Sequence, residues 1–339
     1  MARVIVNASA AKTGGAREIL RSFLREAEGS GHYYYVLCPS PSEFVGDSSN
    51  VKFCEIETSG FLTYFFSVFL VFFYCFRFCS FTVLSLNNVN CPLVPKKITY
   101  FHQEKAVAGR SLRFFLVRLA VRLSFGAVYV VQTQRVKSLL HEFLGVDNDR
   151  ILVRWPGVRR VMNFNGDEAS SVLRSSGLVS ISDLFKSAKV ALLPVYDASS
   201  NHKDFIFFSK LKSELNARGV VTISLCAPGS NVADFDLGIQ SREVMDALYC
   251  LCDYMVVISK QETLCLPIFE FIQTGKPVVC RDADYIRDLT ASFPDWLSSV
   301  QILKSGFNGW EVDRFVSTER NPLSADLVRD VCRGNWTLI

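Results

Sequence analysis

The chain has 339 residues, 49% of them hydrophobic, with a formal net charge of +4, 28 Phe and 11 Cys. This length is sufficient for two domains with separate cores. Residues 1–158 carry 18 Lys and Arg against 11 Asp and Glu, but no recognised nucleic-acid-binding motif accompanies this excess, which argues against nucleic acid as a partner. The Cys residues lack metal-ligand spacing and the N-terminus lacks a signal-peptide core, so we predict a cytoplasmic protein with free thiols and no zinc site.

In the first half of the chain, short apolar runs alternate with segments of helical periodicity. The expected strands are Arg3–Asn7, Tyr33–Leu37, Thr82–Leu86, Ile98–Phe101, Ala127–Gln132 and Ile151–Val153. The expected helices are Ala16–Glu28, Ser111–Ser124 and Arg135–Leu144. This alternation is typical of an α/β fold with a parallel sheet.

Residues 61–76, FLTYFFSVFLVFFYCF, form the most hydrophobic stretch of the chain. A transmembrane helix needs about 20 apolar residues, so this stretch is short for a span. Seven basic residues and no acidic residue lie in the range 105–137, and four of them would share one half of a helix surface: Arg110, Arg113, Arg118 and Arg122. A buried helix beside a solvated basic face is one interpretation. We favour a peripheral protein that docks on anionic lipid at the inner face of a membrane.

Two loops in the first half follow predicted strands and carry candidate binding residues. The sequence KTGGA, residues 12–16, includes Gly15, and its glycines would let the backbone approach a phosphate closely. It is neither a Walker A motif nor GxGxxG, and a simple turn explains it as well. His102 ends the predicted strand Ile98–Phe101. A structural histidine and a ligand-contacting one are equally consistent with that position.

The second half repeats the alternation after a polar segment, Pro156–Ser176. We therefore predict a domain at 1–158, a linker at 159–186 and a second domain at 187–339. The expected strands are Val190–Val195, Val220–Leu225, Met255–Ile258 and Val278–Cys280. The expected helices are Asp204–Ala217, Ser241–Cys252 and Leu266–Thr274.

The most informative stretch is SKQETLCLPIFEFIQTGKPVV, residues 259–279. Glu262 falls in a loop between a predicted strand and helix, and Glu270 lies in that helix, eight residues further along the chain. Open α/β sheets bind ligands in the loops beyond the carboxyl ends of their strands. Lys203 lies in a comparable loop, although a solvated lysine at a helix start would look the same. Taken alone, two glutamates at near-helical spacing are also compatible with an ordinary surface.

The pattern Glu262-x7-Glu270 followed by GKPVV resembles the signature of glycosyltransferase family 4. The resemblance implies the GT-B fold, in which two Rossmann-like domains with parallel sheets face each other across a cleft. It also implies that the first domain binds the acceptor and the second binds the nucleotide sugar.

The resemblance assigns a role to each candidate residue. His102 and Glu262 would act at the donor sugar as the catalytic residues, Lys203 would meet the donor diphosphate, and Glu270 would bind the ribose hydroxyls. The other donor-binding positions that it implies are Gly15, Thr263, Leu264, Cys265 and Leu266. The sequence departs from the family in three ways near the site: Cys265 replaces a loop glycine, an Arg that many members carry before the lysine is missing, and Phe271 stands where a small residue is common.

The implied activity is transfer of a hexosyl unit from a nucleotide diphosphate sugar to a hydroxyl group, with retained configuration and without a metal or other cofactor. The Asp-x-Asp matches at Asp147, Asp234 and Asp282 are therefore not expected to bind manganese. A lipid-linked glycan acceptor, as in the assembly of lipopolysaccharide or another cell-surface polysaccharide, would suit membrane docking. Two alternatives stay open. One is a non-catalytic membrane-associated scaffold or subunit, favoured by the departures and an abbreviated C-terminal tail without a returning helix; the other is a nucleotide-sugar epimerase.

Overall fold

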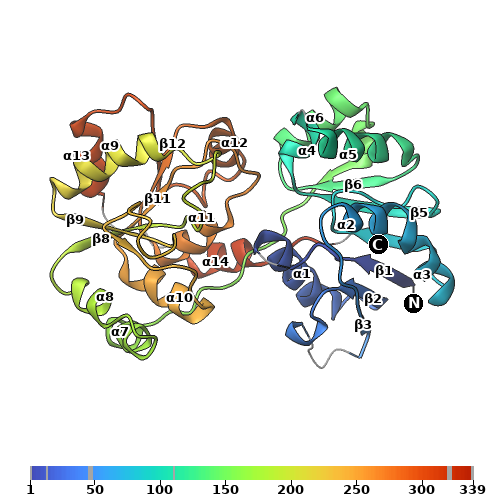
Figure 1. The fold of residues 1–339 in the computed structure, drawn as a ribbon, viewed down its shortest axis with the longest axis horizontal. Helices are drawn as coiled ribbons and strands as arrows, with labels where there is room; N and C mark the ends of the chain where they lie inside the picture. The colour runs from blue at the N-terminus through green and yellow to red at the C-terminus, as the bar shows by residue number, and fades with distance from the viewer. Residues whose placement is uncertain (1, 13, 45–48, 110, 319–322, 337–339) are drawn as a thin grey trace. The chain divides into compact units, whose positions relative to one another are not determined.

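The computed structural model describes residues 2–12, 14–44, 49–109, 111–318 and 323–336. The chain divides into two compact units (Figure 1). Unit 1 comprises Met1–Val158 with Arg333–Ile339, and unit 2 comprises Arg159–Cys332.

Unit 1 contains a seven-stranded sheet within the described residues, in the order β3-β2-β1-β4-β5-β6-β7, and all of its strand pairs are parallel. The strands are β1 (Arg3–Asn7), β2 (Tyr33–Cys38), β3 (Val51–Glu55), β4 (Thr82–Ser85), β5 (Lys96–Phe101), β6 (Val128–Val131) and β7 (Ile151–Val153). The helices are α1 (Gly14–Ala27), α2 (Phe61–Phe65), the π-helical turn η2 (Phe66–Leu70), α3 (Val71–Arg77), α4 (Glu104–Ala108), α5 (Leu112–Leu123) and α6 (Gln134–Leu144), with short 3₁₀ turns η1 (Pro41–Glu43) and η3 (Asn148–Arg150).

Both faces of this sheet are covered, because successive side chains of a strand point to opposite faces. Val4 and Val6 pack in one cluster with Leu20 of α1. Ile5, which lies between them, packs on the other face with Val71 of α3. Strands buried on both faces explain why they are continuous apolar runs in the sequence.

Unit 2 contains a six-stranded parallel sheet within the described residues, in the order β10-β9-β8-β11-β12-β13. The strands are β8 (Lys189–Leu193), β9 (Val220–Ser224), β10 (Phe235–Asp236), β11 (Tyr254–Val257), β12 (Val278–Arg281) and β13 (Val300–Leu303). The helices are α7 (Gly166–Ser175), α8 (Val179–Leu184), α9 (Phe205–Asn216), α10 (Arg242–Leu251), α11 (Leu266–Phe271) with the 3₁₀ turn η4 (Ile272–Thr274), α12 (Asp284–Ser292), α13 (Gly309–Val316) and α14 (Ala325–Cys332).

The segment predicted as a linker is instead largely helical and belongs to unit 2. Asn165 and Glu168 form a reciprocal capping box at the start of α7, and Ala169 and Leu173 are buried on its inner side. The Asn-x-x-Glu spacing is a sequence signal for a helix start. The polar composition of 159–186 obscured it.

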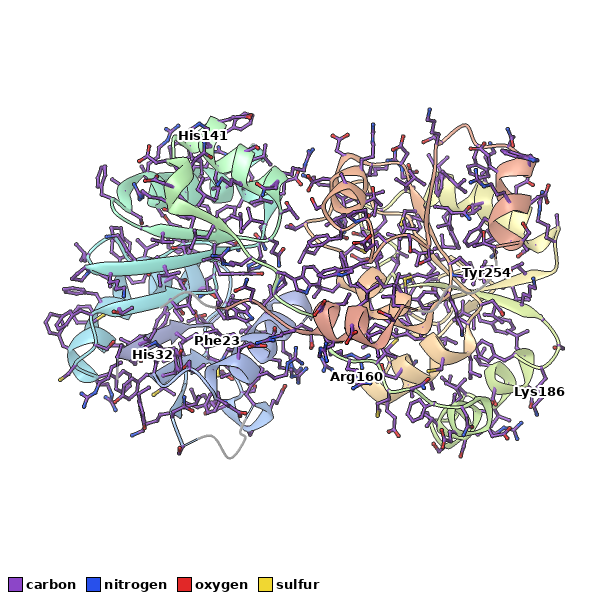
Figure 2. The ribbon with its side chains drawn as sticks, turned by 180° about the vertical axis from the view of Figure 1, so that it is seen from behind. Phe23, His32, His141, Arg160, Lys186 and Tyr254 are labelled. Carbon is purple, nitrogen blue, oxygen red and sulfur yellow. The ribbon has the colours of Figure 1, made fainter. Side chains whose placement is uncertain are left out.

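The last described residues return to unit 1. The backbone N–H of Asn335 donates to the Trp155 carbonyl at 2.8 Å. The ring of Trp336 packs against Tyr100, with centroids 5.0 Å apart, and against Phe23 of α1, at 5.5 Å. Phe23 is labelled in Figure 2, which shows the ribbon from the side opposite to that of Figure 1. The helix that precedes this return, α14, lies in unit 2, and the described residues that return, 333–336, form no helix.

None of the described helices combines the length and the apolar character that crossing a bilayer requires. The aromatic stretch predicted from the sequence forms the continuous run α2–η2–α3, which ends at Arg77.

Candidate functional site

The candidate residues of unit 2 gather at the point where its strand order reverses. β8 and β11 are neighbours in the sheet, and from them the chain proceeds outward in opposite directions, through β9 to β10 and through β12 to β13. In open α/β sheets the carboxyl ends at such a switch point are where ligands bind. Lys203 follows β8, Glu262 follows β11, and an antiparallel bridge between Lys203 and Ser259 holds the two loops together.

Lys203 and Glu262 form an ion pair that also includes Ser259. The Lys203 Nζ donates to Glu262 Oε1 and to Ser259 Oγ, each at 2.6 Å. Ser259 Oγ lies 3.1 Å from the same carboxylate oxygen, and His202 Nε2 lies 3.7 Å from it. The Lys203 side chain is 14% exposed, so this is a largely desolvated ammonium group beside a half-buried carboxylate. Such a lysine is a point charge suited to a phosphate group.

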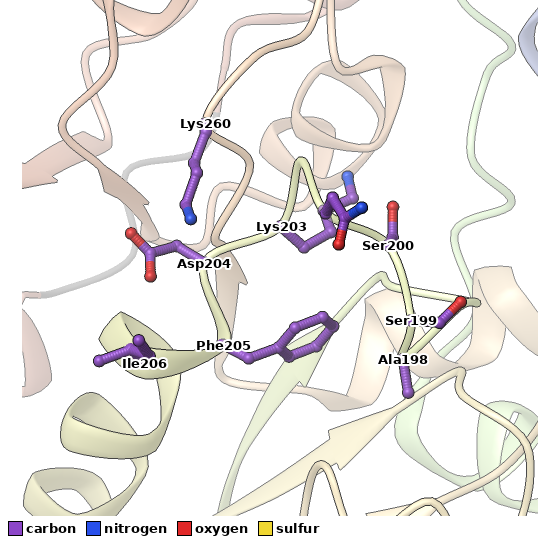
Figure 3. Close-up of a pocket in the computed structure, with 9 residues that line it drawn as sticks. Ala198, Ser199, Ser200, Lys203, Asp204, Phe205, Ile206 and Lys260 are labelled. Atoms are coloured by element: carbon purple, nitrogen blue, oxygen red, sulfur yellow. The ribbon is translucent and has the colours of Figure 1, made fainter.

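A pocket of about 250 Å³ opens beside this pair (Figure 3). Ser199, Ser200 and Lys203 from the loop after β8 line it, together with Lys260 from the loop after β11. Asp204 at its floor accepts a hydrogen bond from Arg281 Nε and caps α9 through the Phe207 N–H; it also faces the charge of Lys260. Burial alone would raise the pKa of Asp204, but these donors and the two cations lower it, so the carboxylate stays ionised.

The loop between Glu262 and α11 turns through a left-handed residue at Cys265, with φ of 50° and ψ of 65°. Leu264 is buried, and Pro267 lies within the first turn of α11. Burial first, and the charge of Glu262 second, raise the pKa of Cys265 to about 12, so its sulfur is a neutral thiol. Thr263 and Leu266, the other predicted loop positions, are half-buried on either side of this turn. The predicted helix and its stop at Gly275 are present as α11 and η4, with Gly275 at φ 71°.

Glu270 on α11 is held by two side chains of unit 2. Tyr249 on α10 donates its O–H to Glu270 Oε2 at 3.0 Å, and Arg159 Nε lies 3.5 Å from Oε1. Burial first, and the carboxylate charge second, raise the pKa of Tyr249 well above its ordinary value, so its phenol remains a donor. Glu270 is 12% exposed. Tyr196, in the loop after β8, is half-exposed; burial raises the pKa of its phenol, and the charge of the nearby Glu270 carboxylate also raises it.

Arg159 and Asp246 are site residues that the sequence analysis missed. Arg159 donates from Nη1 to Asp246 Oδ2 at 2.6 Å, its Nη2 forms an ion pair with Oδ1, and Asp246 is 1% exposed. Burial would lower the pKa of Arg159, but its hydrogen bonds to Asp246 and the charge of Glu270 raise it above the ordinary value. The sequence holds no signal for this pairing, because the two residues are 87 positions apart.

Gly15 and His102 lie in unit 1, after strands β1 and β5. Gly15 is exposed within α1, and the left-handed residue is Gly14, the first of that helix, at φ 60°; Thr13 lies outside the described residues. The His102 and Gln103 N–H groups both donate to Asn88 Oδ1, at 2.7 and 3.1 Å, which fixes the backbone at the strand end. Burial lowers the pKa of His102 to about 4, so the imidazole is neutral at pH 7.

The Asp-x-Asp match at Asp234 has a structural explanation. Its Oδ2 accepts from the Thr222 N–H and hydroxyl, both at 2.8 Å, while Oδ1 accepts from Asn216 and pairs with Lys212. These bonds tie β9 to the turn before β10. Metal independence itself stays a prediction.

No family model and no curated protein matches the sequence. Several solved structures, in contrast, are similar to this chain. HepE of Anabaena, in complex with UDP and glucose, is 15% identical over 85% of this chain and 83% of its own, with a TM-score of 0.61. WaaG, a glycosyltransferase involved in lipopolysaccharide biosynthesis, is 13% identical over 97% of this chain and 92% of its own, with a TM-score of 0.64. Sucrose-phosphate synthase of Thermosynechococcus elongatus is 10% identical over 98% and 95%, with a TM-score of 0.69.

At these identities the likeness establishes the fold. Two parallel-sheet α/β units and the similarity of nearly the whole chain to glycosyltransferases confirm the predicted GT-B fold class.

Proposed function

We propose that this protein is a retaining glycosyltransferase of family 4 type, which moves a hexosyl unit from a nucleotide diphosphate sugar to a hydroxyl acceptor. The observation that carries the proposal is the convergence of Lys203, Ser259 and Glu262 at the switch point of unit 2, with Glu270 on the helix that follows. HepE, which has a similar fold, was crystallised with UDP and glucose.

The reaction breaks the bond between the sugar carbon and the diphosphate oxygen and forms a bond from that carbon to the acceptor oxygen on the same face, while the proton of the acceptor hydroxyl passes to the departing diphosphate. Negative charge builds on the leaving diphosphate, where Lys203 would supply a fixed cation. Glu270, oriented by Tyr249 and Arg159, would accept hydrogen bonds from the ribose hydroxyls. Glu262, His102, Gly15 and the loop 263–266 would hold the sugar. None of these roles requires a metal.

We further propose a lipid-linked glycan of a cell-surface polysaccharide as the acceptor, with the enzyme on the inner face of a membrane. WaaG, which has a similar fold, is involved in lipopolysaccharide biosynthesis. The exposed aromatic residues of unit 1 are compatible with a membrane-borne substrate.

Calorimetric titration with UDP sugars and GDP sugars, with and without chelator, tests the donor site. We expect one nucleotide class to bind independently of metal, and Glu270→Ala to abolish that binding while circular dichroism shows an unchanged fold. An unchanged affinity in this variant would contradict the assignment of Glu270. Glu243→Ala, at an exposed position in the first turn of α10, is the matched control.

A non-catalytic scaffold is the second candidate, and two observations favour it. Cys265 places a thiol where the family has a glycine, and Glu262 already neutralises the lysine expected to meet the diphosphate. If the protein is a non-catalytic scaffold, no nucleotide sugar should bind. If it is a transferase, one donor should bind with micromolar to millimolar affinity.

A further inference from the structure

Unit 1 presents a continuous aromatic surface along α2, η2 and α3. Exposed phenylalanines recur every three or four residues on one side of this helical run: Phe61, Phe65, Phe69, Phe73 and Phe76. The most exposed, Phe61 and Phe73, leave 66% and 65% of their surface in solvent. Single exposed apolar residues are ordinary, but a row of five phenylalanines marks an interaction surface.

The opposite side of the same run is firmly attached to the sheet. Val71 and Cys75 are fully buried against the sheet. Ser67 in the π turn accepts hydrogen bonds from the side-chain amides of Asn7 and Asn87, both at 3.0 Å. The exposed row is therefore the outer face of an ordered helix.

A second apolar row lies on the neighbouring helix α5. Its exposed members are Leu112, Phe115, Leu119 and Leu123. Tyr64 of α2 donates its O–H to the Leu116 carbonyl of α5 at 2.8 Å, and Val68 of η2 shares a buried cluster with Val117. The two rows thus come from helices in contact, and together we call them the aromatic face.

The part of the sequence that builds this face is strongly basic. The two helical segments that carry the face, residues 61–77 and 112–123, contain four Arg and no acidic residue. Arg77, at the end of α3, and Arg122, on α5, are exposed. The predicted row of four arginines on α5 is only partly present: Arg118 turns back to the Val107 and Gly109 carbonyls, while Arg110 and the side chain of Arg113 lie outside what the structure describes.

We propose that the aromatic face rests on an anionic lipid surface, with its phenylalanines in the headgroup boundary and its arginines on lipid phosphates. The helical run α2–η2–α3 covers residues 61–77, 17 positions, and is too short to span. A second copy of the same face is the less suitable occupant, because pairing would bring two positively charged surfaces together.

Flotation of the full-length protein with vesicles tests the proposal without any sugar donor, so its outcome is independent of the proposed transfer activity. The wild type is expected to bind vesicles that contain phosphatidylglycerol and to bind pure phosphatidylcholine weakly. The variant Phe61→Ser/Phe69→Ser/Phe73→Ser should lose about 100-fold in partition coefficient, roughly fivefold per half-inserted ring. The matched control is Ile206→Ser/Ile239→Ser/Trp310→Ser, which removes three exposed apolar side chains of unit 2 and should bind like the wild type.

A variant with two charges removed tests the role of the arginines independently of the phenylalanines. Arg77→Gln/Arg122→Gln should weaken binding to anionic vesicles about fivefold for each charge, with no change on neutral vesicles. The proposal is overturned if the wild type ignores anionic vesicles or if the triple Phe variant binds as well as the control. It is also overturned if sedimentation shows a dimer that the Phe variant converts to a monomer, since the face would then be occupied by a second copy.

Discussion

The buried pair of Arg159 and Asp246 supports the sharpest prediction about stability. Asp246 is 1% exposed and Arg159 is 10% exposed, and two guanidinium nitrogens contact the carboxylate. In Arg159→Met, the one hydrogen bond that the described residues would still give Asp246 comes from the Met162 N–H, at 3.3 Å. Each lost hydrogen bond to a charged group is worth about 1.5–3 kcal/mol, and an uncompensated buried charge costs about 3–5 kcal/mol. We therefore expect the free energy of unfolding of unit 2 to fall by about 3–5 kcal/mol.

Urea unfolding followed by circular dichroism measures this loss, and hydrogen exchange read peptide by peptide assigns it to unit 2. The matched control is Arg160→Met, at the adjacent exposed position that Figure 2 labels, and it should change stability by less than about 0.5 kcal/mol. The double variant Arg159→Met/Asp246→Leu should recover most of the loss, because it removes both charges. A loss below about 1 kcal/mol in the single variant, or a double variant no more stable than the single one, would refute the reasoning.

Three further predictions concern binding, pH and packing. Tyr249→Phe removes a hydrogen bond of about 1.5–3 kcal/mol to Glu270, so calorimetry should show nucleotide-sugar affinity reduced about 10- to 100-fold; an unchanged Kd would separate this phenol from the donor site. His102 has a pKa lowered to about 4 by burial, so between pH 6.5 and 4 the unfolded chain takes up a proton that the folded chain does not. Stability should therefore rise with pH across this window, by up to about 3 kcal/mol, and His102→Asn should flatten the profile; parallel profiles would exclude a buried neutral imidazole. Gly334→Ala would place a Cβ 2.7 Å from the Pro156 carbonyl oxygen, so urea unfolding should show unit 1 destabilised by about 1–3 kcal/mol, and a neutral result would mean that the returning tail has room to shift.

The interior of both sheets was predictable from the sequence, whereas three of their edges were not. The ten strands expected from apolar runs are all present, with ends that differ from the predicted ones by at most two residues. The strands that were missed, Val51–Glu55, Phe235–Asp236 and Val300–Leu303, each lie at a sheet edge. An edge strand is less buried and so lacks a continuous apolar run; the first of these has no fully buried residue.

For the candidate site, the sequence predicted positions but not partners. Lys203 and Glu262 each follow an apolar run, and that alone places both at the carboxyl edge. Their ion pair depends on β8 and β11 being neighbours, a matter of strand order that local sequence does not encode. For the same reason the support of Glu270 by Arg159 could not be predicted from residues so far apart in the chain.

Cys265 shows what a departure from a family pattern changes and what it leaves alone. A left-handed residue with a side chain costs about 1–2 kcal/mol relative to glycine, yet Cys265 adopts φ 50°. Because Leu264 and Ile268 are buried on either side, packing of the loop compensates this strain. This left-handed conformation is one that glycine adopts readily, so the thiol is the difference that remains. Since Glu262 and Glu270 both act on the pKa of that thiol, the sulfur lies near both glutamates, where it would alter the volume of a donor pocket.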